Sequence, residues 1–219
     1  MRARLNRRAR FDDRCRWLSQ SDWLAGVDEV GRGCLAGPGV VAAVVLPPAL
    51  ELPGVRDSKR LSLAARERAY KLIQAEALAV SALAVHQEEV DRLNILHASL
   101  AGMRRVVERL ERRHARPVGH VLVDGHQLPE GMDKRATSVV KGDDRSQSIA
   151  AASIVAKVLR DRVMKSWARR YPQYGFERHV GYPTPEHREA LISHGPCPLH
   201  RQSFAPVALA AARAAGSSS

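Results

Sequence analysis

The sequence contains 219 residues, which is long enough to bury one sizeable hydrophobic core and does not require a second domain. Hydrophobic residues make up 45% and charged residues 26% of the chain, an ordinary composition for a globular protein that excludes intrinsic disorder. The 35 lysines and arginines outnumber the 23 aspartates and glutamates, so the formal net charge is +12. We therefore expect a polyanionic partner such as nucleic acid.

The cysteines and the apolar segments indicate where the protein works. Cys15, Cys34 and Cys197 are far apart and form no CxxC pair of the kind that holds zinc or carries out redox chemistry, which favours a reducing cytoplasm. No apolar stretch follows the basic N-terminus, and the longest apolar run, residues 40–46, is too short to cross a bilayer. We expect a cytoplasmic protein that does not insert into membranes.

The first half of the chain is predicted to alternate strands and helices after a basic arm. Arginines interrupt any apolar periodicity in residues 1–21, so we expect a flexible arm there. Apolar runs predict strands at residues 24–30 and 40–46, separated by a glycine-rich turn. A helix should follow from residue 63 to about residue 77, with Ser62 as its N-cap.

The second half is predicted to contain three more strands and two long helices. Short apolar runs predict strands at residues 79–86, 118–123 and 136–140. Residues 94–113 and 147–170 repeat apolar side chains at alternating spacings of three and four, which predicts two amphipathic helices. Strands interleaved with helices indicate an α/β domain in which helices pack on a mixed β-sheet.

The C-terminal end is predicted to carry one more helix and then a tail. Thr184 is a cap residue, Pro185 suits the first helical position, and Glu186 places an acid in the first turn. Residues 207–219 should form a frayed tail. Residues 22–206 are thus expected to form one domain, since no linker or repeat divides them.

Three of the predicted strands end at or near acidic residues, which is unusual in so basic a chain. These residues are Asp28 and Glu29, then Asp124, then Asp143 and Asp144. Carboxylates that emerge from adjacent strands would converge on a small volume, where their repulsion costs on the order of several kcal/mol unless cations intervene. Such hard oxygen ligands suit Mg²⁺ or Mn²⁺, and two such ions can promote hydrolysis of a phosphodiester.

Each acidic residue also has a simpler interpretation. Asp28 and Glu29 could form a solvated strand end, Asp124 could belong to a turn, and Asp143 or Asp144 could cap the long helix. The context favours the metal site, because Asp28 and Asp124 interrupt apolar runs in which an uncompensated charge is costly.

The string GVDEVGRG at residues 26–33 resembles the signature of the ribonuclease HII family. Further motifs of that family follow in the same order: DSKRLS at 57–62, LNILHAS at 93–99, VDG at 123–125, VVKGD at 139–143, IAAASIVAKVLRD at 149–161 and GYPTPEH at 181–187. The similarity extends over residues 22–206. It implies a ribonuclease H-like fold, a mixed β-sheet flanked by helices, with a C-terminal helical extension.

The resemblance implies an endoribonuclease that acts on RNA/DNA hybrids and on duplex DNA with embedded ribonucleotides, cutting on the 5′ side of a ribonucleotide. It assigns metal binding and catalysis to four carboxylates: Asp28, Glu29, Asp124 and Asp143. The KGD sequence favours Asp143 over Asp144 as the fourth. Two Mg²⁺ or Mn²⁺ ions would act in the substrate complex, and the products would carry 5′-phosphate and 3′-hydroxyl ends.

The resemblance also implies residues that bind the substrate. The backbone of Gly31, Arg32 and Gly33 would read the 2′-hydroxyl, which separates RNA from DNA, although a tight turn would need the same glycines. Tyr182 would pack against the neighbouring sugar, and a buried tyrosine that fixes its loop is the alternative. Phosphate contacts are expected from three lysines that could equally be solvated surface: Lys59, Lys141 and Lys157.

Two positions depart from the family pattern. Val180 replaces an expected lysine, and Gln202 replaces the second arginine of an HRRSF string, so two possible phosphate contacts are lost. His194, Cys197 and His200 have spacings that could hold a soft metal. Prolines interrupt that stretch and no fourth ligand is near, so we expect a loop without metal.

Two alternative functions remain open from the sequence. Ribonuclease HIII shares the fold and the carboxylates but typically carries an additional N-terminal binding domain, for which residues 1–21 are too few, and Arg32 between two glycines favours HII. A non-catalytic nucleic-acid-binding protein would use the basic arm but leave the acidic residues unexplained. We expect a monomer, and the C-terminal tail shows no convincing aromatic motif for a sliding clamp.

Overall fold

The structure, a computed structural model, describes residues 5–55, 58 and 61–216. The chain forms two compact units, and residues 22–206 contribute to both of them. Unit 1 contains the described residues of Met1–Val30, Val41–Leu83 and Leu100–Val158, and unit 2 those of Gly31–Val40, Ala84–Ser99 and Leu159–Ser219.

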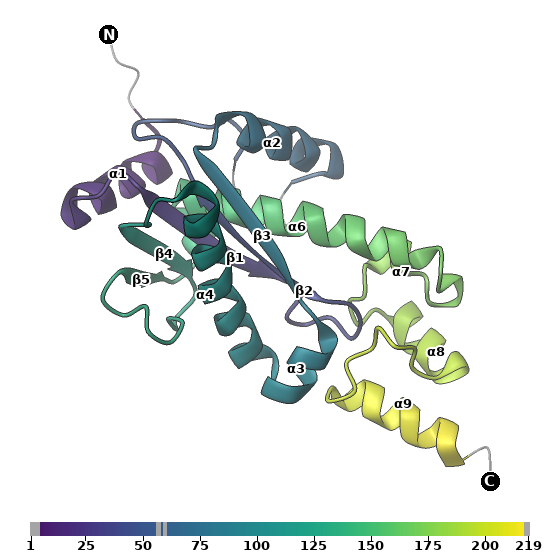
Figure 1. The fold of residues 1–219 in the computed structure, drawn as a ribbon. Helices are drawn as coiled ribbons and strands as arrows, with labels where there is room; N and C mark the ends of the chain where they lie inside the picture. Colours follow the sequence, from purple (N-terminus) through teal and green to yellow (C-terminus); the bar gives the residue numbers. More distant parts are fainter. Residues whose placement is uncertain (1–4, 56–57, 59–60, 217–219) are drawn as a thin grey trace. The chain divides into compact units, whose positions relative to one another are not determined.

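A five-stranded mixed sheet forms the centre of the fold, as the sequence predicts (Figure 1). Its strand order is β3 (Ala79–Val85), β2 (Gly39–Val45), β1 (Leu24–Val30), β4 (His120–Asp124) and β5 (Ala136–Val139). The pairs β1/β4 and β4/β5 are parallel. Every residue of β2 is buried, which explains its continuous apolar sequence. The expected α/β class is therefore confirmed.

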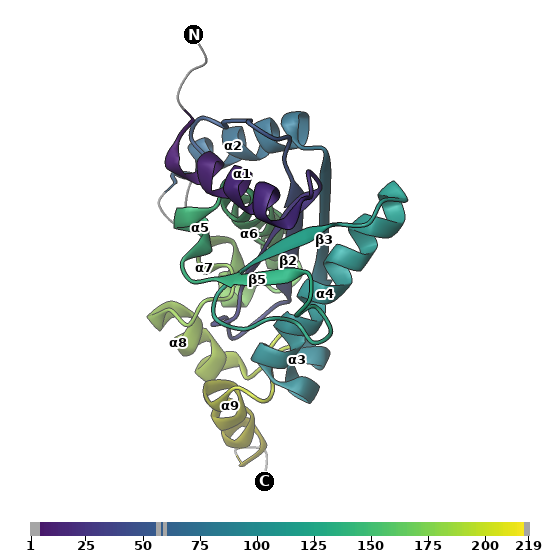
Figure 2. The same cartoon turned by 90° about the vertical axis from the view of Figure 1, so that its left-hand side faces the viewer.

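Helices cover both faces of the sheet in unit 1. Helix α4 (Ile95–His114) lies on one face, while α1 (Arg7–Ser19) and the first half of α6 (Gln147–Ala168) lie on the other (Figures 1 and 2). A Cβ atom on Gly26 of β1 would stand 2.1 Å from the carbonyl carbon of Ser148. Only glycine lets the start of α6 approach the strand this closely. Helices α2 (Leu63–Glu76) and α5 (Gly142–Arg145) complete the regular structure of this unit.

Helix α1 corrects the prediction of a flexible N-terminal arm for Arg7–Ser19. Its buried face consists of Ala9, Asp12 and Arg16. Because two of these inward residues are charged, the sequence of the helix shows no apolar period. The Asp12 carboxylate accepts hydrogen bonds of 2.8 Å from both the backbone N–H and the hydroxyl of Ser148. These paired polar contacts anchor the helix where apolar residues would normally be expected.

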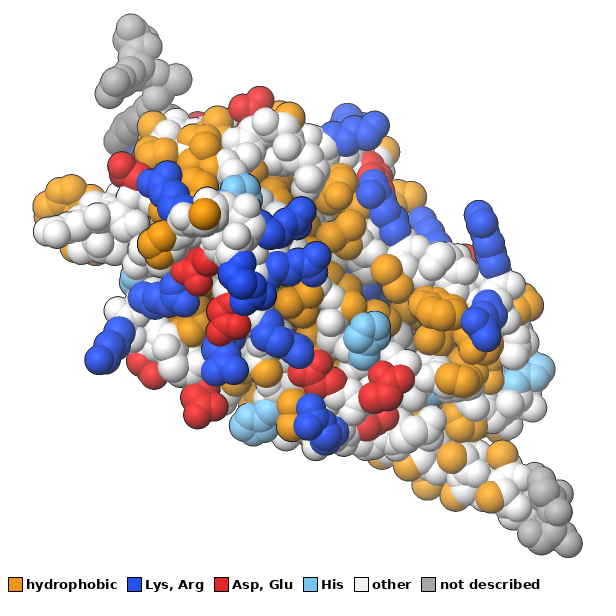
Figure 3. Space-filling model, viewed as in Figure 1, with side chains coloured by type: hydrophobic (Ala, Val, Ile, Leu, Met, Phe, Trp, Pro, Cys, Tyr) orange, Lys and Arg blue, Asp and Glu red, His pale blue; other side chains and the backbone are white. Residues whose placement is uncertain are grey.

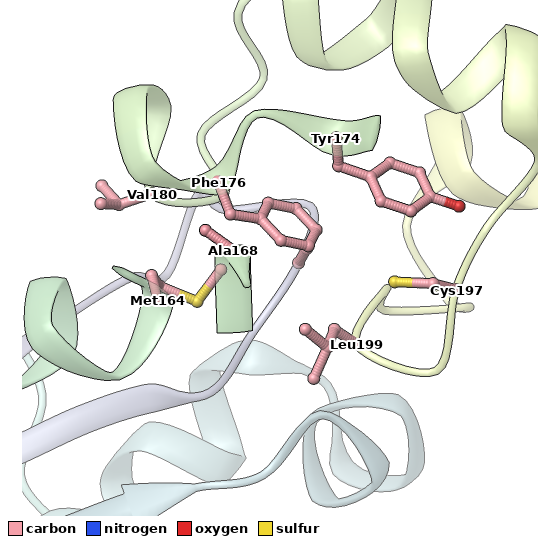
Figure 4. Close-up of a cluster of buried hydrophobic side chains, with 8 residues drawn as sticks. Met164, Ala168, Tyr174, Phe176, Val180, Cys197 and Leu199 are labelled. Carbon is pink, nitrogen blue, oxygen red and sulfur yellow. The ribbon is translucent and has the colours of Figure 1, made fainter. Parts of the chain in front are cut away.

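Unit 2 contains the end of α6 and a series of short helices. These are α3 (Gln87–Leu93), η2 (Pro172–Tyr174), α7 (Phe176–His179), α8 (Pro185–His194) and α9 (Ala205–Gly216). Tyr174 and Phe176 stack with ring centroids 5.3 Å apart within a buried cluster that also holds Met164 and Leu199 (Figure 4). This cluster forms a hydrophobic core of unit 2.

The C-terminal helical extension is longer than predicted. Thr184 caps α8, as expected, by accepting a hydrogen bond from the His187 N–H. Helix α9 occupies most of the segment predicted as a frayed tail, because Val207 and Ala210 are buried against Leu191 of α8. None of the helices in the described residues is both long and apolar enough to cross a membrane.

Candidate active site

The two central parallel strands bring two of the predicted acidic residues to one edge of the sheet. Val27 of β1 pairs with Val123 of β4, so Asp28 and Asp124 follow at the same level on adjacent strands. Because parallel strands end on the same side, both carboxylates lie at the carboxyl edge, where α/β proteins place their sites. Glu29 is the next residue of β1 and is half-buried.

The surroundings of Asp28 strongly perturb its carboxyl group. Its side chain is buried, with only 5% of the residue exposed. Burial first, and then the charges of Glu29 and Asp124, raise the pKa of Asp28 well above its usual range. Its Oδ1 accepts a hydrogen bond of 2.7 Å from the Glu29 N–H, which only partly offsets these effects. A carboxylate in this position is stabilised by a cation.

Asp124 connects the sheet to the short helix that carries the fourth acid. Its Oδ1 accepts a hydrogen bond of 2.6 Å from the Gly142 N–H. Asp143 follows Gly142 on α5 and is half-buried, while Asp144 pairs with Arg8 of α1 at 3.4 Å. The structure thus brings α5 to the end of β4 and gives the two neighbouring aspartates different surroundings.

The donor set fits a hard divalent cation. Carboxylate oxygens are the ligands that Mg²⁺ and Mn²⁺ prefer, and burial together with the charges of Glu29 and Asp124 raises the pKa of Asp28. Within the described residues, no three His, Cys, Asp or Glu side chains are already gathered closely enough to hold a metal ion. Asp28 and Asp124 each accept a backbone N–H on one carboxylate oxygen.

Ser153 is a site residue that the sequence analysis missed. It lies on α6, is buried, and its side chain donates a hydrogen bond to Asp28 that works against the rise in the pKa of that acid. Its hydroxyl oxygen also lies 3.0 Å from that of Ser58. The sequence offers only a weak signal for it, a hydroxyl beside the apolar residues Ile154 and Val155 of the same helix.

The predicted recognition residues lie together in unit 2. Gly31 is buried, with a φ of 94°, whereas Arg32 and Gly33 are exposed. A Cβ atom on Gly33 would have no heavy atom within 4 Å, so the space beside its backbone is open. The Leu35 N–H donates a 2.9 Å hydrogen bond to the carbonyl of Gly181, which precedes the half-buried Tyr182. The glycine turn and the tyrosine loop are therefore neighbours.

The three predicted lysines are not equally placed. Lys59 lies outside the described residues. Lys141 is exposed just before α5, and Lys157 is half-buried on α6. Of the two departures from the family pattern, Val180 packs into the core of unit 2 with a φ of 44°, and the exposed Gln202 donates its backbone N–H to Asp91.

A chain of buried histidines supports the tyrosine loop and was not predicted. His187 Nδ1 donates to the Tyr182 carbonyl at 2.9 Å, and its Nε2 lies 3.1 Å from Nε2 of His200. The Cys197 N–H in turn donates to His200 Nδ1 at 2.9 Å. Each ring nitrogen in this chain has a partner when both histidines are neutral, and burial lowers the pKa of each to about 4. His194 is exposed at the end of α8.

Charges on the surface are mixed where α4 lies. On that face of unit 1, lysines and arginines are interspersed with aspartates and glutamates (Figure 3). Arg104 and Glu108 of α4 form one such ion pair at 3.5 Å. The net positive charge of the chain is therefore partly compensated on this face.

Solved structures with the same fold define the class of protein. The chain is similar to the ribonuclease H2 from Pyrococcus horikoshii OT3, with a TM-score of 0.71 and 23% identity, over 87% of this chain and 97% of that one. It is also similar to a chain in the PCNA:RNase HII complex from Archaeoglobus fulgidus, with a TM-score of 0.64 and 28% identity, over 83% and 95% of the two chains. The chain therefore has the ribonuclease H-like fold.

Sequence comparison identifies the family. Residues 25–207 match the family model for ribonuclease HII. The ribonuclease HII of Maricaulis maris (strain MCS10) is 50% identical over 181 residues, which are 83% of this chain and 81% of that protein. The chain belongs to the ribonuclease HII family and is an endoribonuclease, as the motifs predict. This family uses divalent metal ions, and the match decides between ribonuclease HII and HIII.

Proposed function

We propose that this endoribonuclease hydrolyses the RNA strand of RNA/DNA hybrids and cuts on the 5′ side of single ribonucleotides in duplex DNA. The products would carry 5′-phosphate and 3′-hydroxyl ends. The observation that carries this proposal is the buried Asp28 beside Glu29 and Asp124, because three acids so placed call for a cation. The family match supports the same activity.

Four carboxylates would hold two Mg²⁺ or Mn²⁺ ions: Asp28, Glu29, Asp124 and Asp143. When bound, the ions would activate the attacking water and stabilise the leaving 3′-oxygen. The chain's own groups prepare these ligands, since Ser153 and the Gly142 N–H orient two of the carboxylates. The ion pair between Asp144 and Arg8 favours Asp143 as the fourth ligand.

Recognition of the ribonucleotide is assigned to unit 2. The open space beside Gly33 would allow the backbone of Gly31, Arg32 and Gly33 to approach a 2′-hydroxyl. Tyr182 would pack its ring against the neighbouring sugar. Phosphate contacts would come from Lys59, Lys141 and Lys157, and these contacts would make affinity fall as salt rises.

The experiment is cleavage of two labelled substrates, a duplex with one ribonucleotide in a DNA strand and a long RNA/DNA hybrid. Each is incubated with Mg²⁺, with Mn²⁺ or with EDTA, and the ends of the products are mapped. We expect a metal-dependent cut on the 5′ side of the ribonucleotide, with an all-DNA duplex left intact. Cleavage that survives EDTA, or a cut in the all-DNA duplex, would overturn the proposal.

We further propose that the enzyme acts as a cytoplasmic monomer. Sedimentation of the purified chain should give a monomer at the concentration used for cleavage. Activity that rises with self-association would contradict this proposal.

A further inference from the structure

Two arginines of unit 2 are fully buried. Arg160 on α6 and Arg201 before α9 each have 0% exposure, and they are the largest side chains in the buried set. Burying a guanidinium is costly unless its donors are satisfied. The cost shows in Arg201, because burial lowers its pKa to about 10. Retaining two such charges in a small unit calls for a specific role.

Both guanidinium groups donate to backbone carbonyls of the segment that carries the glycine turn. Arg201 Nη1 donates to the Arg32 carbonyl at 2.9 Å, and its Nε and Nη2 donate to Gly37 at 3.1 and 3.0 Å. Arg160 Nε and Nη2 donate to the carbonyls of Pro38 and Ala36 at 2.9 and 3.0 Å. The two side chains therefore fix the path of the backbone after Gly31.

Arg160 also joins this segment to the tyrosine loop. Its Nη1 donates to the Val180 carbonyl at 2.7 Å, and its Cζ lies 5.8 Å from the centroid of the Tyr182 ring. A Cβ atom on Gly31 would stand 2.3 Å from Arg160 Nε, and one on Gly181 would stand 2.4 Å from the Ala36 carbonyl oxygen. These glycines are needed because the guanidinium and the two loops pack without space for a methyl group.

The contact of Arg201 with Arg32 has a direct consequence for the next residue. The Arg32 carbonyl and the Gly33 N–H belong to one planar trans peptide, so they point in opposite directions. Because Arg201 holds this carbonyl toward the interior, the Gly33 N–H points away from it. Gly33 is exposed, and the space beside its Cα is open. The peptide is thereby oriented to donate a hydrogen bond to a group that approaches from solvent.

We propose that Arg201 and Arg160 are positioning residues that set ribonucleotide specificity. Arg201 orients the Arg32–Gly33 peptide toward the 2′-hydroxyl, and Arg160 holds the glycine turn and Tyr182 at a fixed separation. Both residues act through the backbone they bind. The inference rests on the proposed recognition of the 2′-hydroxyl by the glycine turn. Lysine cannot replace either residue, because one ammonium group cannot reproduce the planar fork that binds several carbonyls.

The test measures duplex binding in the Asp124→Asn background with Mg²⁺, so that cleavage does not interfere. Fluorescence anisotropy gives affinities for duplexes that differ only in one ribonucleotide or deoxyribonucleotide, and their ratio is the selectivity. Arg201→Lys should lower this ratio about tenfold while the affinity for the all-DNA duplex changes less than about twofold. Arg213→Lys, an exposed arginine of α9, is the matched control and should leave both values unchanged.

Arg160→Lys provides a second and independent measurement. Its effect on the affinity for the ribonucleotide duplex should largely disappear when Tyr182 is already Ala, because both changes remove the same placement of the ring. If circular dichroism shows that Arg201→Lys does not fold, the Arg160→Lys measurement tests the proposal by itself. Equal losses for both duplexes, or unchanged selectivity in a folded variant, would overturn the inference. A parent protein without selectivity would instead overturn the proposed recognition by the glycine turn.

Discussion

The two units bury charge in opposite ways. In unit 1, Asp28 lies beside Glu29 and Asp124, and its burial, followed by these like charges, raises its pKa. In unit 2, Arg160 and Arg201 are buried more completely, yet every nitrogen of both guanidinium groups donates to a backbone carbonyl. The acids are left in need of a ligand, whereas the arginines are already satisfied.

This difference distinguishes buried charges that take part in catalysis from buried charges that stabilise the structure. Buried groups that are hydrogen-bonded to the backbone hold a structure in place, as the arginines do for the glycine turn. Buried carboxylates that repel one another are stabilised by a cation from solution, either a proton or a metal ion. Substitutions and pH changes that act on one kind of buried group and spare the other test this distinction.

The largest effect is expected where a converging carboxylate is removed. Asp124→Asn should lower the cleavage rate by more than about a hundredfold, because a neutral amide cannot replace a charged metal ligand. Asp133→Asn, an exposed acid in the loop after β4, should retain activity. Initial rates on the single-ribonucleotide duplex measure both. Comparable rates for the two variants would show that the charge at Asp124 is dispensable.

Acidification from pH 6.5 to 4 should destabilise unit 2 by on the order of several kcal/mol. Burial lowers the pKa of His187 and His200 from 6.5 to about 4, so the unfolded chain takes up these protons first. The stability that the two neutral histidines contribute is complete above pH 6.5. It is lost as the pH falls toward 4, by about 1.4 kcal/mol per pH unit for each histidine. Urea unfolding across this range measures how steeply the free energy of unfolding falls as the pH falls. His187→Gln should make this dependence less steep, and His194→Gln, at an exposed position, should leave it unchanged. The same pH dependence of the free energy of unfolding in both variants would contradict the assignment of this effect to the buried histidines.

A smaller effect is expected for the hydroxyl behind Asp28. Ser153→Ala removes the side-chain hydrogen bond to that carboxylate and should lower the cleavage rate about 10- to 100-fold. The loss should lessen at higher Mn²⁺ concentration, since the hydroxyl only orients a ligand. Ser166→Ala on the same helix, an exposed position, is the control. If the cleavage rate of Ser153→Ala depends on Mn²⁺ concentration as that of the wild-type protein does, Ser153 contributes to packing alone.

The smallest effect is expected at the neighbour of the fourth acid. Asp144→Asn removes an ion pair with Arg8 that is partly exposed, so stability should change by less than about 1 kcal/mol and activity by less than about twofold. Asp143→Asn should instead abolish most of the activity. Parallel assays and thermal melts distinguish the two. A larger activity loss for Asp144→Asn than for Asp143→Asn would reverse the assignment of the fourth ligand.

Much of the fold could be predicted from local patterns. Strand β1 begins with an apolar run, β2 is apolar throughout, and the apolar period of α4 is regular, so these elements were predicted within a residue or two. Helix α1 was missed because its inward positions are Asp12 and Arg16, whose partners are distant in sequence. The division into two units also depends on distant contacts, which no local pattern records.

The candidate site was predictable only in part. Asp28 and Asp124 stood out as charges inside apolar strands, and the parallel pairing of β1 with β4 does bring those strand ends together. Ser153 and Arg201 gave no such signal, because their roles depend on the group that each one meets. Arg201 in particular is fully buried, and its role is set by carbonyls that lie far from it in sequence.

The most direct test of the metal site is calorimetric titration of Mn²⁺ into the wild-type protein, Asp28→Asn and Asp133→Asn without nucleic acid. The wild-type protein and Asp133→Asn should bind Mn²⁺ with equal affinity, and Asp28→Asn should bind it at least about tenfold more weakly. Undiminished Mn²⁺ affinity in folded Asp28→Asn would contradict the claim that the acids at the sheet edge form the metal site.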